Sequence, residues 1–386
     1  MRGVVLSYPG KRDISAILSE PSAPLLREVG ERRADLFTHQ DIRWLILGDN
    51  AKVLRALRLN PQIKGKVRLV YIDPPYATGQ VFTYSGSLSK QATISRSRNG
   101  RIAYLDTLKG PEYLEFMRER LILIHDLLSN DGTIYVHIGI QVAPYVRILL
   151  NEIFGEEGFI SEITRVKSNP KNFSRRAPGN VKDVILIYAK GPDYIWNEPH
   201  IPFTEEEVRR LFPKVDEEGR RYTTTPLHAP GETINGPTGM LWRGMSPPPG
   251  RHWRYPPEEL ERLDKLGLIE WSSTGNPRKK LYADYHLKKG KKLQDIWEFK
   301  DPPYVLYPTQ KDLELLKLIV SLSSQPGDLV LDAFCGSGTT LLAAHLLGRQ
   351  WIGIDNSPEA IQVAQRRLEE EAQASFKVYC IDERST

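Results

Sequence analysis

The tetrapeptide Asp73-Pro74-Pro75-Tyr76 combines residue types that suit recognition of an amine on a flat ring. The Asp73 carboxylate and the Pro74 carbonyl can both accept hydrogen bonds from an exocyclic amine, and the Tyr76 ring can stack on the base that carries it. Proline fixes the backbone and lacks an N–H donor, so the two acceptors are held ready. Asp-Pro-Pro also commonly ends a strand and opens a turn, so these four residues alone leave both interpretations open.

The sequence context of the tetrapeptide favours the chemical interpretation. Residues 67–72 form an apolar run rich in β-branched side chains, which predicts a buried parallel strand. Open α/β sheets bind their ligands at the carboxyl ends of such strands. The same four residue types recur at 301–304, but there they follow a segment that does not resemble a buried strand. We therefore expect Asp73 to be catalytic and Asp301 to lie in a loop without that role.

A second chemical signal lies near the carboxyl terminus, where Gly336 and Gly338 follow an apolar run. The predicted elements are a strand at 328–332, a loop at 334–340, a helix at 341–347 and a strand at 351–354. Asp355 follows this last strand, roughly twenty residues after the glycines, as in nucleotide-binding βαβ units where an acid binds the ribose. The loop lacks both the phosphate-loop pattern and the third glycine of the dinucleotide fingerprint, which disfavours a nucleoside triphosphatase and a nicotinamide enzyme.

Composition narrows the setting further. The chain has 386 residues and a formal net charge of +5, which is compatible with a polyanionic partner. It contains only two cysteines, Cys335 and Cys380, so no disulfide framework is expected, and we expect Cys335 to be a packing residue. No segment has the length of a membrane span or a signal peptide, which predicts a cytoplasmic protein. No metal site is predicted.

The distribution of these signals predicts four regions. They are an irregular N-terminal arm at 1–40, a catalytic half at 41–190, an insert at 191–305 and a cofactor-binding half at 306–386. Further strands are expected at 44–47, 133–138 and 184–188, helices from residue 52 and over 113–128, and a mobile loop at 80–101. The alternation of strands and helices predicts an α/β fold with a mostly parallel sheet and helices on both faces.

Basic residues cluster beside and within the Pro- and Gly-rich insert. The candidate DNA contacts are Lys167, Lys171, Arg175, Arg176, Arg278, Lys279 and Lys280. Lysine and arginine next to aromatic and amide side chains can contact phosphates and bases, although a solvated surface is the more common role of an isolated charge run. Several clusters in one insert favour the contact with nucleic acid. The insert is therefore predicted to be a recognition module.

These motifs, in this order, resemble the amino-methyltransferases of DNA. The chain is similar to the permuted beta group, in which Asp-Pro-Pro-Tyr precedes the cofactor motif, and within it to the adenine-specific modification methylases of restriction–modification systems. The resemblance extends from about residue 45 to 368. It implies a Rossmann-like S-adenosylmethionine-dependent methyltransferase fold with an inserted target-recognition region.

The resemblance assigns roles to individual residues. Asp73, Pro74, Pro75 and Tyr76 match the catalytic motif. The cofactor residues that it implies are Phe334, Gly336 and Gly338 in the S-adenosyl-L-methionine loop, Asp332 near the methionine ammonium, Asp355 on the ribose, Asp49 beside the adenine, and Thr309, Gln310 and Lys311 at the methionine end. The chain departs from the family pattern at Ala77, Asp312 and Ala333, which puts loop geometry in question.

The implied reaction is methyl transfer to the N6 amine of an adenine flipped out of double-stranded DNA. Cytosine-N4 methylation, a non-catalytic nucleic-acid-binding relative, and a methyltransferase acting on RNA or on a protein amide stay open as alternatives. Family cytosine enzymes more often begin the motif with serine, which favours adenine. The resemblance also suggests a homodimer and a cognate restriction endonuclease.

Overall fold

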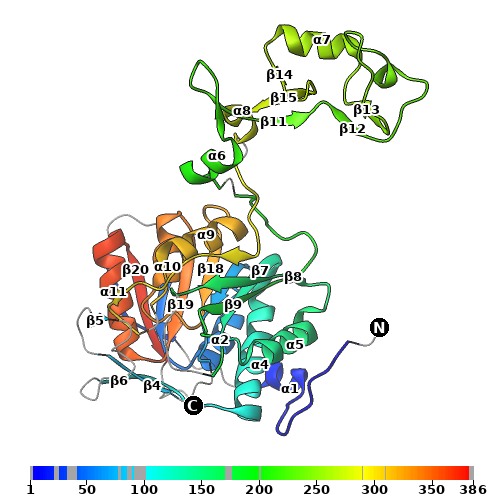
Figure 1. Ribbon diagram of the computed structural model, residues 1–386. Coiled ribbons are helices and arrows are strands. Elements are labelled where there is room, and N and C mark those ends of the chain that lie inside the picture. The colour runs from blue at the N-terminus through cyan, green and yellow to red at the C-terminus, as the bar shows by residue number, and fades with distance from the viewer. Residues whose placement is uncertain are drawn as a thin grey trace. The chain divides into compact units, whose positions relative to one another are not determined.

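The computed structural model describes residues 3–20, 26–32, 41–76, 80–84, 89–90, 101–169, 176–199, 201–288, 290–308 and 310–381. The chain divides into two compact units. The first unit comprises Met1–Asn197 and Gln294–Thr386, and the second comprises Glu198–Leu293. Both units are drawn in Figure 1.

The first unit is built on one large sheet. Its ten strands are β1 (Leu26–Arg32), β2 (Arg43–Leu47), β3 (Val67–Ile72), β7 (Leu128–Ile138), β8 (Phe159–Val166), β9 (Lys182–Ala189), β16 (Ile296–Trp297), β18 (Leu329–Asp332), β19 (Gln350–Asp355) and β20 (Phe376–Ile381). Their spatial order is β1-β20-β2-β19-β18-β3-β7-β9-β8-β16. The strands from β20 to β7 pair in parallel, whereas β1 and β9 pair with their neighbours in the antiparallel sense.

Helices cover both faces of this sheet, as the sequence predicts. They are α1 (Ile14–Ser19), α2 (Asn50–Arg58), α4 (Gly110–Leu127), α5 (Ala143–Phe154), α9 (Leu313–Ser323), α10 (Thr339–Leu346) and α11 (Pro358–Ala372). Leu329 and Leu331 belong to the core cluster formed with α2, α4 and α5. Val330 between them is equally buried but lies outside that cluster, because successive side chains of a strand point to opposite faces. The α/β fold is confirmed (Figure 1).

Two of the helices that flank the predicted site are capped by aspartate side chains. Asp49 accepts a hydrogen bond from the Lys52 N–H at the start of α2. Asp312 caps α9 by accepting from the Leu315 N–H at 3.1 Å. The family usually has proline at this position, and an aspartate N-cap also starts a helix well. The departure at Asp312 therefore leaves the start of α9 intact.

The second unit has its own core and sheet. Its elements are α6 (Glu205–Leu211), β10 (Lys214–Val215), β11 (Arg221–Pro226), β12 (His228–Pro230), the 3₁₀ turn Pro237–Gly239, β13 (Arg251–Trp253), α7 (Pro257–Lys265), β14 (Ile269–Trp271), β15 (Pro277–Tyr282) and α8 (Ala283–His286). Strands β10, β11, β15 and β14 form a four-stranded sheet, and β12 pairs with β13. Trp242 and Trp253 are buried in a small core with leucines of α7.

The boundaries of this unit are narrower than the insert predicted at 191–305. Asn197 is bound to the first unit because its backbone N–H donates to the Leu322 carbonyl at 2.8 Å. On the other side, β16 adds a parallel strand beside β8 in the large sheet. The predicted range therefore included short segments on both sides that pack in the first unit.

The N-terminal arm is more regular than predicted. It contains α1, and β1 pairs antiparallel with β20 at the edge of the large sheet. The β1 sequence Leu-Arg-Glu-Val-Gly-Glu-Arg has no apolar alternation, so the edge strand gave no pattern to detect.

The predicted loop at 80–101 is wrong in part. Residues 80–84 form β4 (Gln80–Tyr84), which pairs with β6 (Arg101–Asp106), and β5 (Ser89–Lys90) pairs with β17 (Tyr304–Val305). The run Val-Phe-Thr-Tyr at 81–84 has high strand propensity, which the polar composition of the whole stretch obscured. The remaining residues of this stretch lie outside the described part of the chain.

No helix in the described ranges is both long and apolar enough to cross a membrane. Within the same ranges, no cluster of three or more His, Cys, Asp or Glu side chains is arranged to hold a metal ion.

Candidate active site and cofactor pocket

Four neighbouring parallel strands each lead to an aspartate at the same edge of the large sheet. In the order of the strands these are Asp49 after β2, Asp355 at the end of β19, Asp332 at the end of β18 and Asp73 after β3. All four line one cavity of about 540 Å³. The structure thus brings the predicted catalytic motif and the predicted cofactor loop to one site.

Both carboxylate oxygens of Asp73 are engaged in this cavity. The Tyr76 hydroxyl donates to Asp73 Oδ1 at 2.8 Å, and Lys311 Nζ lies 2.6 Å from Asp73 Oδ2. Burial, reinforced by the charge of Asp73, raises the pKa of Tyr76 well above its usual range, so its hydroxyl stays protonated and donates. The Tyr76 ring lies against Gly139, where an added Cβ would stand 3.0 Å from the ring. Tyr76 is therefore fixed by its hydroxyl and by one edge of its ring.

A chain of buried polar side chains lies behind β3. The Tyr71 hydroxyl and His137 Nδ1 are 2.8 Å apart, and His137 Nε2 lies 3.4 Å from Asp183 Oδ2. Burial lowers the pKa of His137, so its ring is neutral. Burial alone would raise the pKa of Asp183, but His137 and Lys167 outweigh it and the pKa falls. The consistent arrangement has Tyr71 donating to Nδ1 and the Nε2–H facing an ionised Asp183.

Two residues that the sequence analysis singled out form ion pairs with buried side chains next to this row of polar groups. Lys167, a predicted DNA contact, lies with Nζ 2.7 Å from the buried carboxylate of Asp183. Asp301 pairs with the buried Arg165 at 2.7 Å and is not among the described residues that line the cavity. Replacing Asp301 would remove an ion-pair partner of the buried Arg165, so we expect this change to affect the structure around Arg165.

The glycine loop has the backbone that close ligand approach requires. Gly336 and Gly338 have φ angles of 49° and 74°, and a Cβ at Gly338 would lie 2.9 Å from the Ala364 Cβ. Asp355 Oδ2 accepts from the Gly336 N–H at 2.9 Å, so the same aspartate shapes the loop. A side chain at Gly338 would be strained both by its φ angle and by its neighbour.

Asp332 is the most unusual acid of the site. It is 2% exposed, and its Oδ1 accepts from the Phe334 N–H at 3.0 Å. Burial raises its pKa to about 7 despite hydrogen bonds that act in the opposite direction. A buried carboxylate with a raised pKa favours a cationic ligand, since a nearby positive charge would stabilise its ionised form. The ammonium and sulfonium groups of S-adenosylmethionine fit this requirement.

Cys335 lies in the same glycine loop. It is buried, and burial raises the pKa of its thiol well above the usual range. A thiolate nucleophile is therefore disfavoured at this position, in line with the packing role expected from the sequence.

Arg120 is a residue of the pocket that the sequence analysis missed. It is 5% exposed, and its guanidinium donates to Asn50 Oδ1 at 2.5 Å and to Asp49 Oδ2 at 3.1 Å. The same group lies over the Phe116 ring, 3.6 Å from its centroid. Asn50 in turn donates to the Ala333 carbonyl at 2.8 Å beside the glycine loop. Arg120 thus links α4 to the start of α2 and the cofactor loop.

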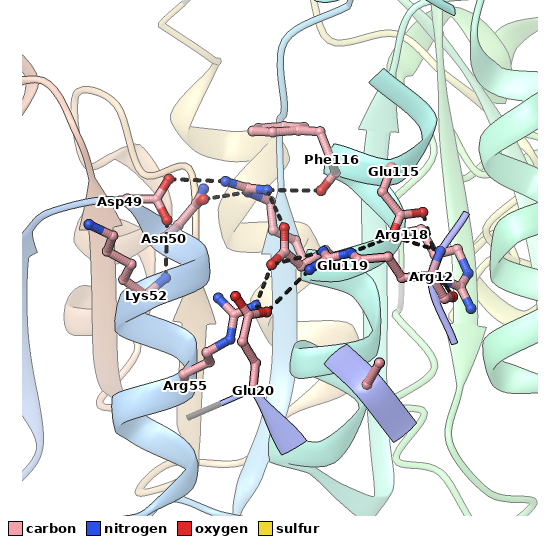
Figure 2. Close-up of polar contacts among 12 residues, drawn as sticks. Arg12, Glu20, Asp49, Asn50, Lys52, Arg55, Glu115, Phe116, Arg118 and Glu119 are labelled. Carbon is pink, nitrogen blue, oxygen red and sulfur yellow. Dashed lines mark hydrogen bonds and ion pairs between the residues drawn. The ribbon is translucent and has the colours of Figure 1, made fainter. Parts of the chain in front are cut away.

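A network of charges extends from this point to the N-terminal segment (Figure 2). Arg55 pairs with both Glu119 and Glu20, and Arg12 pairs with Glu115, Glu119 and Glu20. Charges of opposite sign therefore alternate from the residues that flank α1, through α2 and α4, to Asp49 at the cavity. Phe116 and Arg120 stand four positions apart on the helix predicted at 113–128, and this spacing was the one available sequence signal.

We expect Arg120→Met to weaken cofactor binding about tenfold, because Asp49 and Asn50 lose a charged hydrogen-bond donor. Isothermal titration with S-adenosylhomocysteine measures the effect. Arg118→Met is the matched control, since Arg118 is equally buried on the same helix but donates to the Arg12 carbonyl. Equal losses of affinity in the two variants would show a general effect on folding instead.

The remaining predicted residues are placed as follows. Phe334 and Gln310 line the cavity with Lys311, whereas Thr309 and Ala77 lie outside the described residues. Lys171 and Arg175 also lie outside the described residues, and Arg176 is exposed.

The basic run at 278–280 does not present a single face. Arg278 donates to Thr224 of β11, and Lys280 lies 5.5 Å from the centroid of the Tyr222 ring on the same strand. Lys279 donates to the Tyr255 hydroxyl at 3.0 Å. Successive side chains on a strand alternate between faces, so adjacency in sequence did not place these three charges together.

Comparison with known proteins identifies the family. Residues 67–366 match the DNA methylase family of N6/N4 type. The chain is 44% identical to the type II methyltransferase M.EcaI of Enterobacter cloacae over 95% of this chain and 77% of that protein. It is 28% identical to the type III restriction-modification enzyme StyLTI Mod subunit of Salmonella typhimurium, over 79% of this chain and 50% of that subunit.

Among solved structures, the M1.HpyAVI–SAM complex aligns with a TM-score of 0.43 and 20% identity, covering 84% of this chain and 100% of that one. The family match covers most of the chain, and M.EcaI is similar over nearly all of it. The chain therefore belongs to the N6/N4 DNA methylase family of restriction–modification systems and is a DNA methyltransferase that uses S-adenosyl-L-methionine.

Proposed function

We propose that this DNA methyltransferase transfers the methyl group to the N6 amine of an adenine. The observation that supports this most strongly is the position of Asp73-Pro74-Pro75-Tyr76 at the carboxyl end of β3, in one cavity with the glycine loop. The motif begins with aspartate, whereas family enzymes for cytosine more often begin it with serine.

The target base must leave the DNA stack, because a paired amine cannot reach a donor inside the protein. Its nitrogen is a poor nucleophile since the lone pair is delocalised into the ring. Asp73 and the Pro74 carbonyl accept hydrogen bonds from the two amine hydrogens and favour a pyramidal nitrogen. Asp332 and Asp355 hold the cofactor end of the site, so catalysis rests on positioning and electrostatics without a covalent intermediate.

The test is the identity of the product. The purified protein is incubated with S-adenosylmethionine and plasmid DNA, and the DNA is digested to nucleosides for mass spectrometry. We expect N6-methyldeoxyadenosine. Detection of N4-methyldeoxycytidine instead would show that the target base is cytosine. Sequencing of methylated bases in DNA from cells that express the protein would give the recognition site.

The second unit is proposed to recognise the DNA target. Arg251, Arg254 and Arg278 surround His228, whose pKa is lowered first by burial and then by these three charges. Arg251 Nη1 lies 3.2 Å from His228 Nδ1, and both Arg251 and Arg254 are exposed. This cluster of positive charge around β12, β13 and the start of β15 suits contact with phosphates better than Lys279 and Lys280 do.

We expect the double variant Arg251→Ala/Arg254→Ala to bind duplex DNA more weakly and to lower the slope of log affinity against log salt by roughly two, because each lost phosphate contact removes about one released counterion. Fluorescence anisotropy at several salt concentrations measures it. The control is Arg262→Ala, which removes an exposed arginine of the same unit that is paired with Glu259. An unchanged salt slope would remove this cluster from the DNA interface.

The relatives support one further partner. Several of them are Mod subunits of type III restriction-modification enzymes, so we propose that a cognate restriction endonuclease recognises the same site. A homodimer stays a proposal based on the family resemblance.

A further inference from the structure

The ammonium group of Lys311 lies next to the catalytic motif. Its Nζ lies 2.6 Å from Asp73 Oδ2 and 5.8 Å from the centroid of the Tyr76 ring. The side chains of Lys311 and Asp73 are only 10% and 15% exposed, so water screens this pair weakly. The lysine therefore interacts directly with the carboxylate that has to accept the target amine.

The ion pair between Lys311 and Asp73 is unfavourable for methyl transfer because of the positive charge of Lys311. The target nitrogen gains positive charge as it takes the methyl group, and an ammonium bound to the same carboxylate would repel that charge. Tyr76 already donates to Asp73 Oδ1, so Oδ2 is the oxygen that the amine needs. Lys311 consequently has to leave Oδ2 when the base enters.

The cavity itself indicates where Lys311 can go. Among the described residues that line it, the acids are Asp49, Asp73, Asp332, Asp355 and Glu359, and the cations are Arg120 and Lys311. Arg120 is held by Asp49 and Asn50 at the start of α2. Lys311 is the other cation of this set, and its long side chain has several rotatable bonds with which to reach the carboxylate of S-adenosylmethionine.

We propose that Lys311 is a positioning residue shared by two carboxylates. It holds Asp73 until its ammonium turns to the carboxylate of the cofactor, and this exchange frees Asp73 Oδ2 for the target amine. Cofactor binding thereby permits capture of the flipped base, so the enzyme engages its base productively only when the methyl donor is present. This inference rests on the proposed function, since it requires a flipped amine base at Asp73.

The experiment measures base capture without turnover. A duplex carries 2-aminopurine next to the target adenine, and its fluorescence rises when the adenine leaves the stack. Two probes without a transferable methyl group are compared: S-adenosylhomocysteine, which has the carboxylate, and decarboxylated S-adenosylhomocysteine, which lacks only that group. In the wild-type protein we expect a rise several-fold larger with S-adenosylhomocysteine than with the decarboxylated compound or with no cofactor.

Variants of Lys311 separate this role from a structural one. In Lys311→Met the fluorescence should rise fully without any cofactor, and the dissociation constant for S-adenosylhomocysteine should increase about tenfold while that of the decarboxylated compound changes little. Lys311→Arg keeps the charge and should restore cofactor dependence. Lys317→Met is the control because Lys317 is on α9, outside the cavity, and pairs with Glu314.

Equal fluorescence in all wild-type arms, or unchanged cofactor dependence in Lys311→Met, would overturn the proposal. The product assay on the same wild-type protein distinguishes this failure from failure of the proposed function. N6-methyldeoxyadenosine formed without cofactor-dependent capture refutes only the role of Lys311, whereas its absence refutes the assignment of adenine as the target.

Discussion

Replacement of Asp73 by asparagine is expected to lower kcat for methyl transfer by about 10²–10³-fold, the size of effect seen when one preorganised polar contact to the reacting group is removed. Asparagine keeps the shape of the side chain but loses its negative charge. The amine would then lack the acceptor that stabilises positive charge growing on its nitrogen. Single-turnover incorporation of labelled methyl groups into DNA measures this step directly.

The same variant is expected to keep its fold and its affinity for the cofactor. Asp73 caps none of the helices that the structure describes, and loss of its charge releases Lys311 for the cofactor carboxylate, so the dissociation constant for S-adenosylhomocysteine should not rise. Asp193→Asn, an exposed substitution outside the cavity, serves as the control. Retention of more than about a tenth of the wild-type kcat by Asp73→Asn would exclude Asp73 as the principal acceptor of the amine.

The four aspartates of the site show what sequence could predict. Each follows or ends a short apolar run, so strand periodicity placed Asp73, Asp332 and Asp355 at strand ends, and the family resemblance added the cofactor roles of Asp49 and Asp332. Their meeting in one cavity depends on the order of β2, β19, β18 and β3 in the sheet. That order is a long-range property, and only the resemblance indicated it.

The ion pairs and hydrogen bonds between the side chains of the site could not be predicted from the sequence. The pair formed by Lys311 and Asp73 joins residues far apart in the chain, and the position of Arg120 depends on how α4 packs against α2. The two partners of each pair are brought together by tertiary packing, which leaves no local period or spacing. Edge strand β1 escaped detection for a related reason, since backbone pairing with β20 defines it more than its side chains do.

We expect the affinity for S-adenosylmethionine to depend on pH because of Asp332. Burial raises its pKa to about 7, so in the free protein the carboxyl binds a proton below that pH. The cationic groups of S-adenosylmethionine favour the ionised carboxylate, and the proton must leave on binding. Affinity should therefore increase by up to about tenfold per pH unit as the pH rises from 6 to 7 and should level off above 8.

The same shift fixes the sign of the stability change without cofactor. The folded protein holds the Asp332 proton up to about pH 7, whereas an unfolded aspartate releases it near the usual aspartate pKa of 3.8. Between these values the folded state binds more protons, so the contribution of this group to stability falls as pH rises through the window. Bound cofactor should offset this loss, and the thermal shift that it produces should grow from pH 6 to 8.

Asp332→Asn separates this effect from other titrations. Titration calorimetry of wild-type protein at pH 6 in buffers of different ionisation enthalpy should show up to one proton released per cofactor bound, and the variant should release fewer. The variant should bind S-adenosylmethionine weakly at every pH, because a neutral amide neither titrates nor attracts the ammonium and sulfonium groups of the cofactor. A wild-type dissociation constant that is flat between pH 6 and 8 would mean that Asp332 is already ionised before binding, and the cationic end of the cofactor would then have to be held elsewhere.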